Sequence, residues 1–126
     1  MKIKSDKLEL FQNIAQFDFD KISYDFHNDF DCTKVKFQNN VLILVFRNII
    51  SNFFISLSFY KTTFTFCELD FTEKIDTLTI DNLYRGKFEI DGTLMEFENG
   101  RGYFYLEFYE GQKIEFWSES IMIEKE

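Results

Sequence analysis

The side chains of this chain that can act as nucleophiles, general bases or metal ligands are few and widely spaced. Its 126 residues include one histidine, His27, and two cysteines, Cys32 and Cys67. A zinc site needs several Cys or His ligands at close spacing, which these residues do not supply. His27 and Cys32 are five residues apart, so in a strand they lie far apart or on opposite faces. We therefore predict no catalytic residue, no metal and no cofactor. We interpret both cysteines as free thiols, with a 32–67 disulfide as the alternative.

Carboxylates are abundant, with 22 Asp and Glu residues against 14 Lys and Arg residues. One acidic run consists of Asp18, Asp20, Asp25, Asp29 and Asp31. This run lacks the residue order and the glycine of a calcium-binding loop. A second group, Glu96, Glu107 and Glu115, has the residue type of a glycosidase pair, but that chemistry also needs a cleft and a carboxyl of raised pKa. We interpret both groups as solvated acidic surface or as part of a binding surface.

The charge and the chain ends exclude several classes of partner. A net charge of -8 repels phosphate backbones and anionic membranes, so we expect neither nucleic acid nor a membrane as partner. The first seven residues are too charged to begin a signal peptide. The longest apolar run, residues 41–46, is much shorter than the roughly 20 residues of a membrane-spanning helix. These features, with only two cysteines, predict a cytoplasmic location.

Alternating apolar and polar residues predict the fold class. We expect a mainly β protein, α+β at most, with residues 1–126 forming a single domain. Its predicted architecture is an antiparallel β-sandwich or part-closed barrel of about 8–10 strands with one short N-terminal helix. The helix is predicted over residues 7–16, irregular strands and hairpins over 17–81, and a C-terminal antiparallel meander over 83–124. Within the middle segment, Asn39-Asn40 predicts a two-residue turn, and Val41–Phe46 predicts a central strand buried on both faces.

Glycines mark the turns of the predicted meander. Asp91-Gly92 and Asn99-Gly100 predict two-residue hairpin loops, and residues 109–111 predict a three-residue loop with glycine at the left-handed position. These registers assign one face to the core, with Phe88, Ile90, Met95, Phe97, Phe104, Leu106, Phe108, Ile114 and Phe116. On the opposite face they place Lys87, Glu96, Tyr103 and Trp117 in one cross-strand row and Glu89, Leu94, Tyr105 and Glu115 in the next.

This second face is the predicted binding surface. Its expected partner-binding residues are Glu89, Leu94, Glu96, Tyr103, Tyr105, Glu107, Glu115 and Trp117. Tyr and Trp bury a large area at low entropic cost, so Tyr103, Tyr105 and Trp117 are the expected anchors. Glu89, Glu96 and Glu115 are expected to favour a partner with a basic surface. The alternative is that other parts of the chain cover this face.

Two segments have a recognisable order of residues. The first is Gly102–Phe108, followed by Gly111 and by Ile114–Trp117, and the second is Asp31-Cys32, followed by alternating strands about Asn39-Asn40. Both segments resemble small bacterial immunity-type proteins. The resemblance implies a toxin as partner and no catalysis. Proteins of this type are typically encoded beside polymorphic toxins and neutralise them by binding.

The leading functional hypothesis is therefore a non-catalytic protein-binding inhibitor, an immunity-type antagonist that occludes a toxin or another enzyme. A viral inhibitor of a host defence protein has the same sequence features. A different class is also open, namely a β-barrel that binds an apolar, lipid-like molecule. That alternative predicts Phe54, Phe64 and Phe66 around an internal void.

Overall fold

The fold is built from antiparallel strands. A computed structural model describes residues 2–5, 16–19, 21–69, 78–86, 88–90, 92–95, 97–98 and 100–125. All regular secondary structure in these residues is β-strand, and the two main sheets do not close into a barrel. The predicted mainly β class is confirmed. Positions 7–15 of the predicted helix lie outside the described residues, and Gln16 begins a strand.

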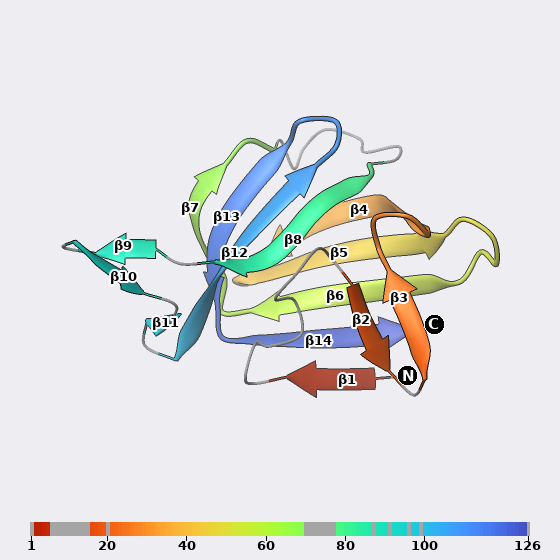
Figure 1. The fold of residues 1–126 in the computed structure, drawn as a ribbon, viewed down its shortest axis with the longest axis horizontal. Coiled ribbons are helices and arrows are strands. Elements are labelled where there is room, and N and C mark those ends of the chain that lie inside the picture. The colour runs from red at the N-terminus through yellow and green to blue at the C-terminus, as the bar shows by residue number, and fades with distance from the viewer. Residues whose placement is uncertain are drawn as a thin grey trace.

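Sheet I contains five strands that run side by side in Figure 1. Their order is β1 (Lys2–Ser5), β14 (Ser120–Lys125), β6 (Phe54–Tyr60), β5 (Val41–Asn48) and β4 (Phe30–Gln38). The predicted turn between β4 and β5 is confirmed, because Gln38 pairs with Val41 and both intervening asparagines have positive φ, 53° and 61°. Asparagine tolerates this left-handed backbone better than most residues.

The central strand β5 is buried on one face only. Leu42, Leu44 and Phe46 are fully buried, whereas Val41, Ile43 and Val45 are half-buried. The prediction that this apolar run is buried on both faces is therefore wrong. The run alternates like any other strand, so its second set of apolar side chains lies on the outer face of sheet I.

Sheet II packs across sheet I. Its main path is β11 (Phe97–Glu98), β12 (Arg101–Phe108), β13 (Lys113–Ser118) and β7 (Thr63–Cys67), and β8 (Ile80–Gly86) also pairs with β12. Two hairpins complete the described strands, β2 (Gln16–Phe19) with β3 (Ile22–Asp25), and β9 (Phe88–Ile90) with β10 (Thr93–Met95). The fourteen strands described exceed the predicted 8–10, because several are only two to four residues long.

The predicted meander is half correct. The β12–β13 register is confirmed, with Phe104 opposite Phe116 and Leu106 opposite Ile114 across a turn at residues 109–111. On the other side of β12, however, Phe104 pairs with Arg85 of β8 rather than with Met95. Strand β8 forms six residue pairs with β12 and buries Ile80 and Leu83. The strands β10 and β11 are only three and two residues long and cannot form as many pairs.

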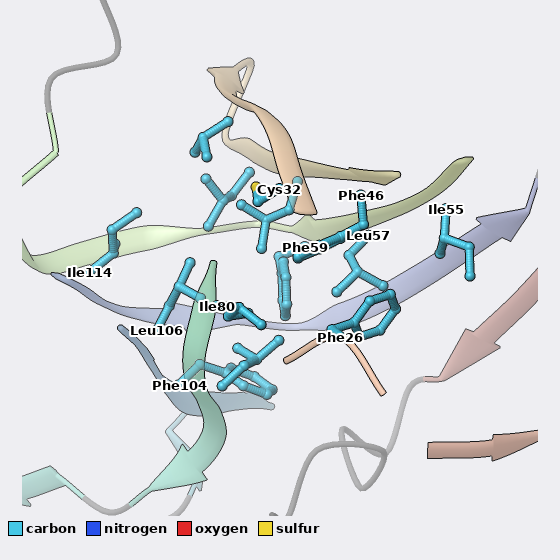
Figure 2. Packing of buried hydrophobic residues seen from close by; sticks show 14 of the residues in the cluster. Phe26, Cys32, Phe46, Ile55, Leu57, Phe59, Ile80, Phe104, Leu106 and Ile114 are labelled. Atoms are coloured by element: carbon cyan, nitrogen blue, oxygen red, sulfur yellow. The ribbon is translucent and has the colours of Figure 1, made fainter. Parts of the chain in front are cut away.

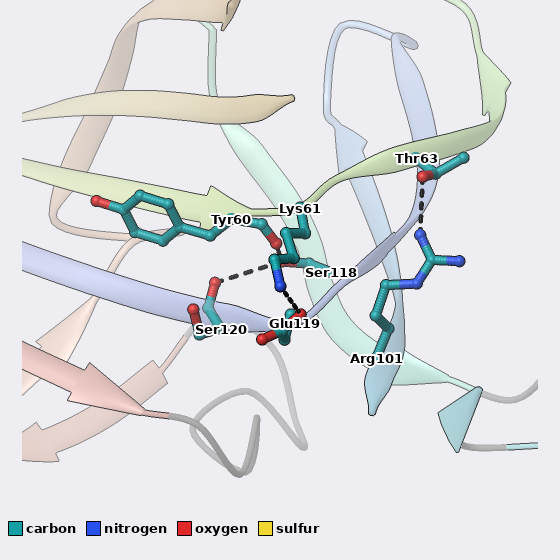
Figure 3. Close-up of polar contacts among 7 residues, drawn as sticks. All are labelled: Tyr60, Lys61, Thr63, Arg101, Ser118, Glu119 and Ser120. Carbon is teal, nitrogen blue, oxygen red and sulfur yellow. Dashed lines mark hydrogen bonds and ion pairs between the residues drawn. The ribbon is translucent and has the colours of Figure 1, made fainter. Parts of the chain in front are cut away.

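Two long ribbons join the sheets at one corner. Strand β6 continues into β7, and β13 continues into β14, so the same pair of ribbons belongs to both sheets (Figure 1). At the bend, Ser118 Oγ donates to the Tyr60 carbonyl at 2.8 Å and Lys61 pairs with Glu119 at 2.9 Å (Figure 3). At the opposite edge, Cys32 of β4 and Leu78 form an isolated bridge. An isolated bridge is not a continuous ladder of hydrogen bonds, so the two sheets do not close into a barrel at this edge.

Phenylalanine rings fill the space between the sheets. Phe59 of β6 lies 5.4 Å from Phe104 and 5.0 Å from Phe116, measured between ring centroids. Leu57, Leu106 and the other side chains drawn in Figure 2 complete this layer. Five members of the predicted core face have described side chains, and all five are buried, which confirms their direction: Phe104, Leu106, Phe108, Ile114 and Phe116.

Candidate protein-binding surface

Two predicted anchors of the binding surface are buried. Tyr103 and Trp117 pair in register across β12 and β13, with ring centroids 4.8 Å apart. They point away from the Phe104–Phe116 core, as predicted, yet Tyr103 is only 2% exposed and Trp117 only 4% exposed. The expectation that both rings face solvent is therefore wrong. Strand alternation determines on which side of the sheet a ring lies, but not whether another segment covers it.

The Tyr103 hydroxyl has polar partners on two strands. It shares a 2.5 Å hydrogen bond with Thr65 Oγ1 and donates to Glu115 Oε1 at 3.4 Å. Burial raises the pKa of Tyr103 from 10.0 to about 12; the Thr65 hydrogen bond opposes this rise and the Glu115 charge adds to it. The phenol is therefore protonated at neutral pH, and its hydrogen bonds to Thr65 and Glu115 stabilise the sheet.

The adjacent part of this face remains accessible. Tyr105 is the register partner of Glu115, and Glu107 is the partner of Lys113. All four side chains are half-exposed, and Lys113 Nζ lies 3.8 Å from the Glu115 carboxylate. Three of the predicted binding residues, Tyr105, Glu107 and Glu115, thus lie side by side on two neighbouring strands.

Two aromatic residues join this accessible region. Phe66 is 39% exposed opposite Glu115, and Tyr109 is 76% exposed at the β12–β13 turn. We define the acidic patch as Phe66, Tyr105, Glu107, Tyr109 and Glu115; Lys113 lies among them and offsets one of the two carboxylate charges. Neither Phe66 nor Tyr109 is among the binding residues predicted from the sequence.

A β-bulge explains the position of Phe66. Phe64 pairs with Phe116 and Phe66 pairs with Glu115, so Thr65 is an extra residue with no counterpart on β13. A bulge of one residue reverses the faces of all residues that follow it. Phe64 therefore packs inward against Phe37, at a centroid distance of 4.6 Å, while Phe66 lies outside. In the sequence, Phe64 and Phe66 are two residues apart, which predicts that both lie on the same face of a regular strand. This spacing gives no indication of the bulge.

The structure describes only part of the other three predicted binding residues. Leu94 and Glu89 are register partners in the separate β9–β10 hairpin, and their side chains lie outside what the structure describes. Glu96 lies wholly outside the described residues. The positions predicted for Glu96 and Leu94 beside Tyr103 and Tyr105 are taken by Gly86 and Tyr84 of β8.

Residues with possible catalytic roles have structural partners. His27 Nδ1 lies 2.6 Å from the carbonyl oxygen of Ile80, which fixes the ring against β8. Cys32 is buried, and burial raises the pKa of its thiol from 9.0 to about 12, so it stays protonated at neutral pH. Both cysteines are free, and Cys67 is exposed. Asp25 accepts hydrogen bonds from the backbone N–H groups of His27 and Asn28, and so holds the turn after β3.

The phenylalanines of the carrier hypothesis do not surround one void. Phe64 packs in the interior, whereas Phe54 is 40% exposed and pairs with Arg47 on sheet I. Phe66 is exposed on sheet II. The three side chains therefore lie in three different environments.

In the described residues, no group of three or more His, Cys, Asp or Glu side chains is arranged to hold a metal ion. Nor does the described part of the chain include a helix of sufficient length and apolar character to cross a bilayer. Comparisons with protein-family models, with characterised protein sequences and with solved structures gave no match to this chain.

Proposed function

We propose that this chain is a non-catalytic protein-binding antagonist that uses the acidic patch to cover a toxin or another enzyme. The observation that supports this proposal is the juxtaposition of accessible aromatic rings and carboxylates on paired strands. Tyr105 and Glu115 are cross-strand neighbours, and exposed Phe66 lies next to Glu115 on the edge strand. Paired strands hold these groups rigidly, so little entropy is lost when a partner binds.

The two kinds of side chain have separate tasks in this proposal. Phe66, Tyr105 and Tyr109 supply contact area, because aromatic side chains dominate the energetics of protein interfaces. Glu107 and Glu115 attract a basic partner and raise the association rate, an effect that salt weakens. Inhibition is steric: the bound chain covers the partner's working surface, and no bond is made or broken.

The same chemistry supports a particular class of partner. A basic surface is common on enzymes that act on anionic polymers, and the C-terminal segment resembles immunity-type proteins that neutralise such toxins. We therefore propose a cytoplasmic complex with a basic toxin. The product of the gene adjacent to this one is the first partner to test.

A binding experiment tests this proposal. The purified neighbouring protein is titrated with the wild-type chain and with the double variant Tyr105→Ala/Glu115→Gln, and heat release gives the dissociation constant. We expect the double variant to bind at least about tenfold more weakly, the loss of roughly one interface anchor. Co-expression should show the same order, with the wild-type chain protecting cells and the double variant failing to protect them.

A matched pair of turn variants controls for general effects of surface truncation. Tyr109→Ala lies in the acidic patch, and Ile50→Ala removes a similarly exposed apolar side chain from the β5–β6 turn. Only Tyr109→Ala should weaken binding. Equal affinity of the wild-type chain and the double variant would reject the acidic patch as the binding surface.

A further inference from the structure

The outer face of sheet I has a regular pattern of side chains. Two cross-strand rows pass over β4, β5, β6 and β14 and continue onto β1, where Lys4 pairs with Met122 and Lys2 pairs with Glu124. The first row contains Lys36, Ile43, Ser58 and Met122, and the second contains Lys34, Val45, Ser56 and Glu124. In each row a lysine of the edge strand is followed by a β-branched apolar residue, a serine and a longer side chain.

This pattern forms a ridge and a groove. Ile43 and Val45 form a half-buried apolar ridge along β5, and Ser56 and Ser58 leave a lower strip along β6. A hollow of about 320 Å³ lined by Lys34, Val45, Phe54 and Ser56 lies at one end of this strip. The ridge and the groove lie on adjacent strands, so their spacing equals one strand separation, about 4.8 Å.

The charge of this face differs from that of the whole chain. Its described ionisable side chains are Lys34, Lys36 and Arg47 against Asp31 and Glu124, a net charge of +1. The whole chain carries -8. Two copies of an acidic protein repel each other least when they approach through the face that carries none of the acidic excess.

We propose that the outer face of sheet I binds a second copy of this chain. A two-fold axis parallel to the strands, between β5 and β6, places the Ile43–Val45 ridge of each copy over the Ser56–Ser58 groove of the other. The same axis places β4 over β14 of the partner subunit and keeps each row in line. Lys34 then lies over Glu124 of the partner subunit, and this contact occurs twice in the dimer.

Within one chain, Lys34 and Glu124 are too far apart in the sheet to form an ion pair. Lys34 and Glu124 lie in the same row with two strands between them, about 14 Å apart at three strand separations. Their charges can therefore meet only across the interface. Glu124 also has an interaction within its own chain, so the contact with Lys34 adds to that interaction.

Charge reversal tests the proposed dimer directly. The wild-type chain should show concentration-dependent dimerisation in sedimentation equilibrium from low micromolar to near-millimolar concentration. Lys34→Glu alone and Glu124→Lys alone should each weaken self-association about tenfold or more, because each homodimer then contains two like-charge contacts. An equimolar mixture of the two variants should form a heterodimer, because both contacts become attractive again.

Two further variants distinguish loss of the dimer contact from a general effect of substitution. Lys113→Glu, on the outer face of sheet II, serves as the charge-matched control and should dimerise like the wild-type chain. Ser58→Tyr fills the groove and should weaken the dimer without changing net charge. A wild-type chain that stays monomeric throughout, or a variant mixture that fails to associate, would overturn the proposal.

Discussion

Apolar side chains on the outer faces of the two sheets are buried to different degrees. On sheet II, Tyr103 and Trp117 are almost completely buried although they point away from the central core. On sheet I, Val41, Ile43 and Val45 also point away from the core and are half-exposed. Both sets of side chains lie on the outer face of a paired strand, so strand alternation alone does not account for the difference. Pointing away from the core therefore does not by itself make a side chain accessible.

The same contrast assigns different tasks to the two faces. Sheet II has a sealed aromatic region next to the accessible acidic patch, whereas sheet I has an apolar ridge with nearly balanced charge. In the proposals above, the acidic patch binds a basic protein and the ridge binds a second copy. Because the surfaces lie on opposite sides of the molecule, both complexes can form together.

The largest expected effect comes from Trp117→Ala. Removing a buried indole should lower the free energy of unfolding by about 3–5 kcal/mol, as in protein cores. Val45→Ala, at a half-buried position of sheet I, should cost less than about 1.5 kcal/mol. Urea unfolding of both variants measures the difference. Equal losses would show that the two outer faces are covered to the same degree.

Tyr103→Phe should have an intermediate effect with a characteristic pH dependence. At neutral pH the variant loses the hydrogen bonds of a buried hydroxyl, about 1–2 kcal/mol. The folded chain holds the phenolic proton more tightly than the unfolded chain, with a pKa of about 12 against 10.0. The free energy of unfolding therefore falls as pH rises from about 10 to 12, and this contribution is missing in the variant.

Alkaline unfolding measures this difference. The stability gap between the wild-type chain and Tyr103→Phe should narrow as pH rises through that window. Cys32 contributes a fall of the same sign, beginning nearer pH 9 because its pKa rises from 9.0 to about 12. Cys32→Ala in both backgrounds removes the thiol contribution. A gap that stays constant up to pH 12 would contradict a buried Tyr103 hydroxyl.

The smallest effect on stability is expected from thiol labelling. Cys67 is exposed on the edge strand β7, whereas Cys32 lies buried on β4. At neutral pH an aromatic disulfide reagent should modify one thiol per folded chain rapidly and the second only after denaturation. Labelled protein should melt within a few degrees of unlabelled protein. Rapid reaction of both thiols would show that the edge between β4 and Leu78 opens readily.

Local features of this fold could be predicted from local sequence. The Asn39-Asn40 turn, the loop at residues 109–111 and the β12–β13 register each depend on a few adjacent residues, and all three are confirmed. Each turn requires a particular backbone conformation that asparagine or glycine accepts readily. These features placed Tyr105, Glu107 and Glu115 together.

The errors arise from contacts between distant segments. Pairing of β8 with β12 replaced the predicted neighbours, because β8 offers a longer strand with buried Ile80 and Leu83. The Thr65 bulge depends on the fit between β7 and β13, and the burial of Trp117 depends on what packs over β13. A single sequence encodes such long-range choices without any local pattern that marks them.

The extra residue of the bulge also has a mechanical consequence. Thr65 of β7 reaches past β13 to bind the Tyr103 hydroxyl on β12, so a side chain braces two strands that are not neighbours. Peeling β7 from the sheet must break this brace as well as the ladder to β13. This hydrogen bond links the edge strand β7 to the buried pair Tyr103 and Trp117. Local unfolding of β7 would therefore also remove a hydrogen bond from β12, two strands away.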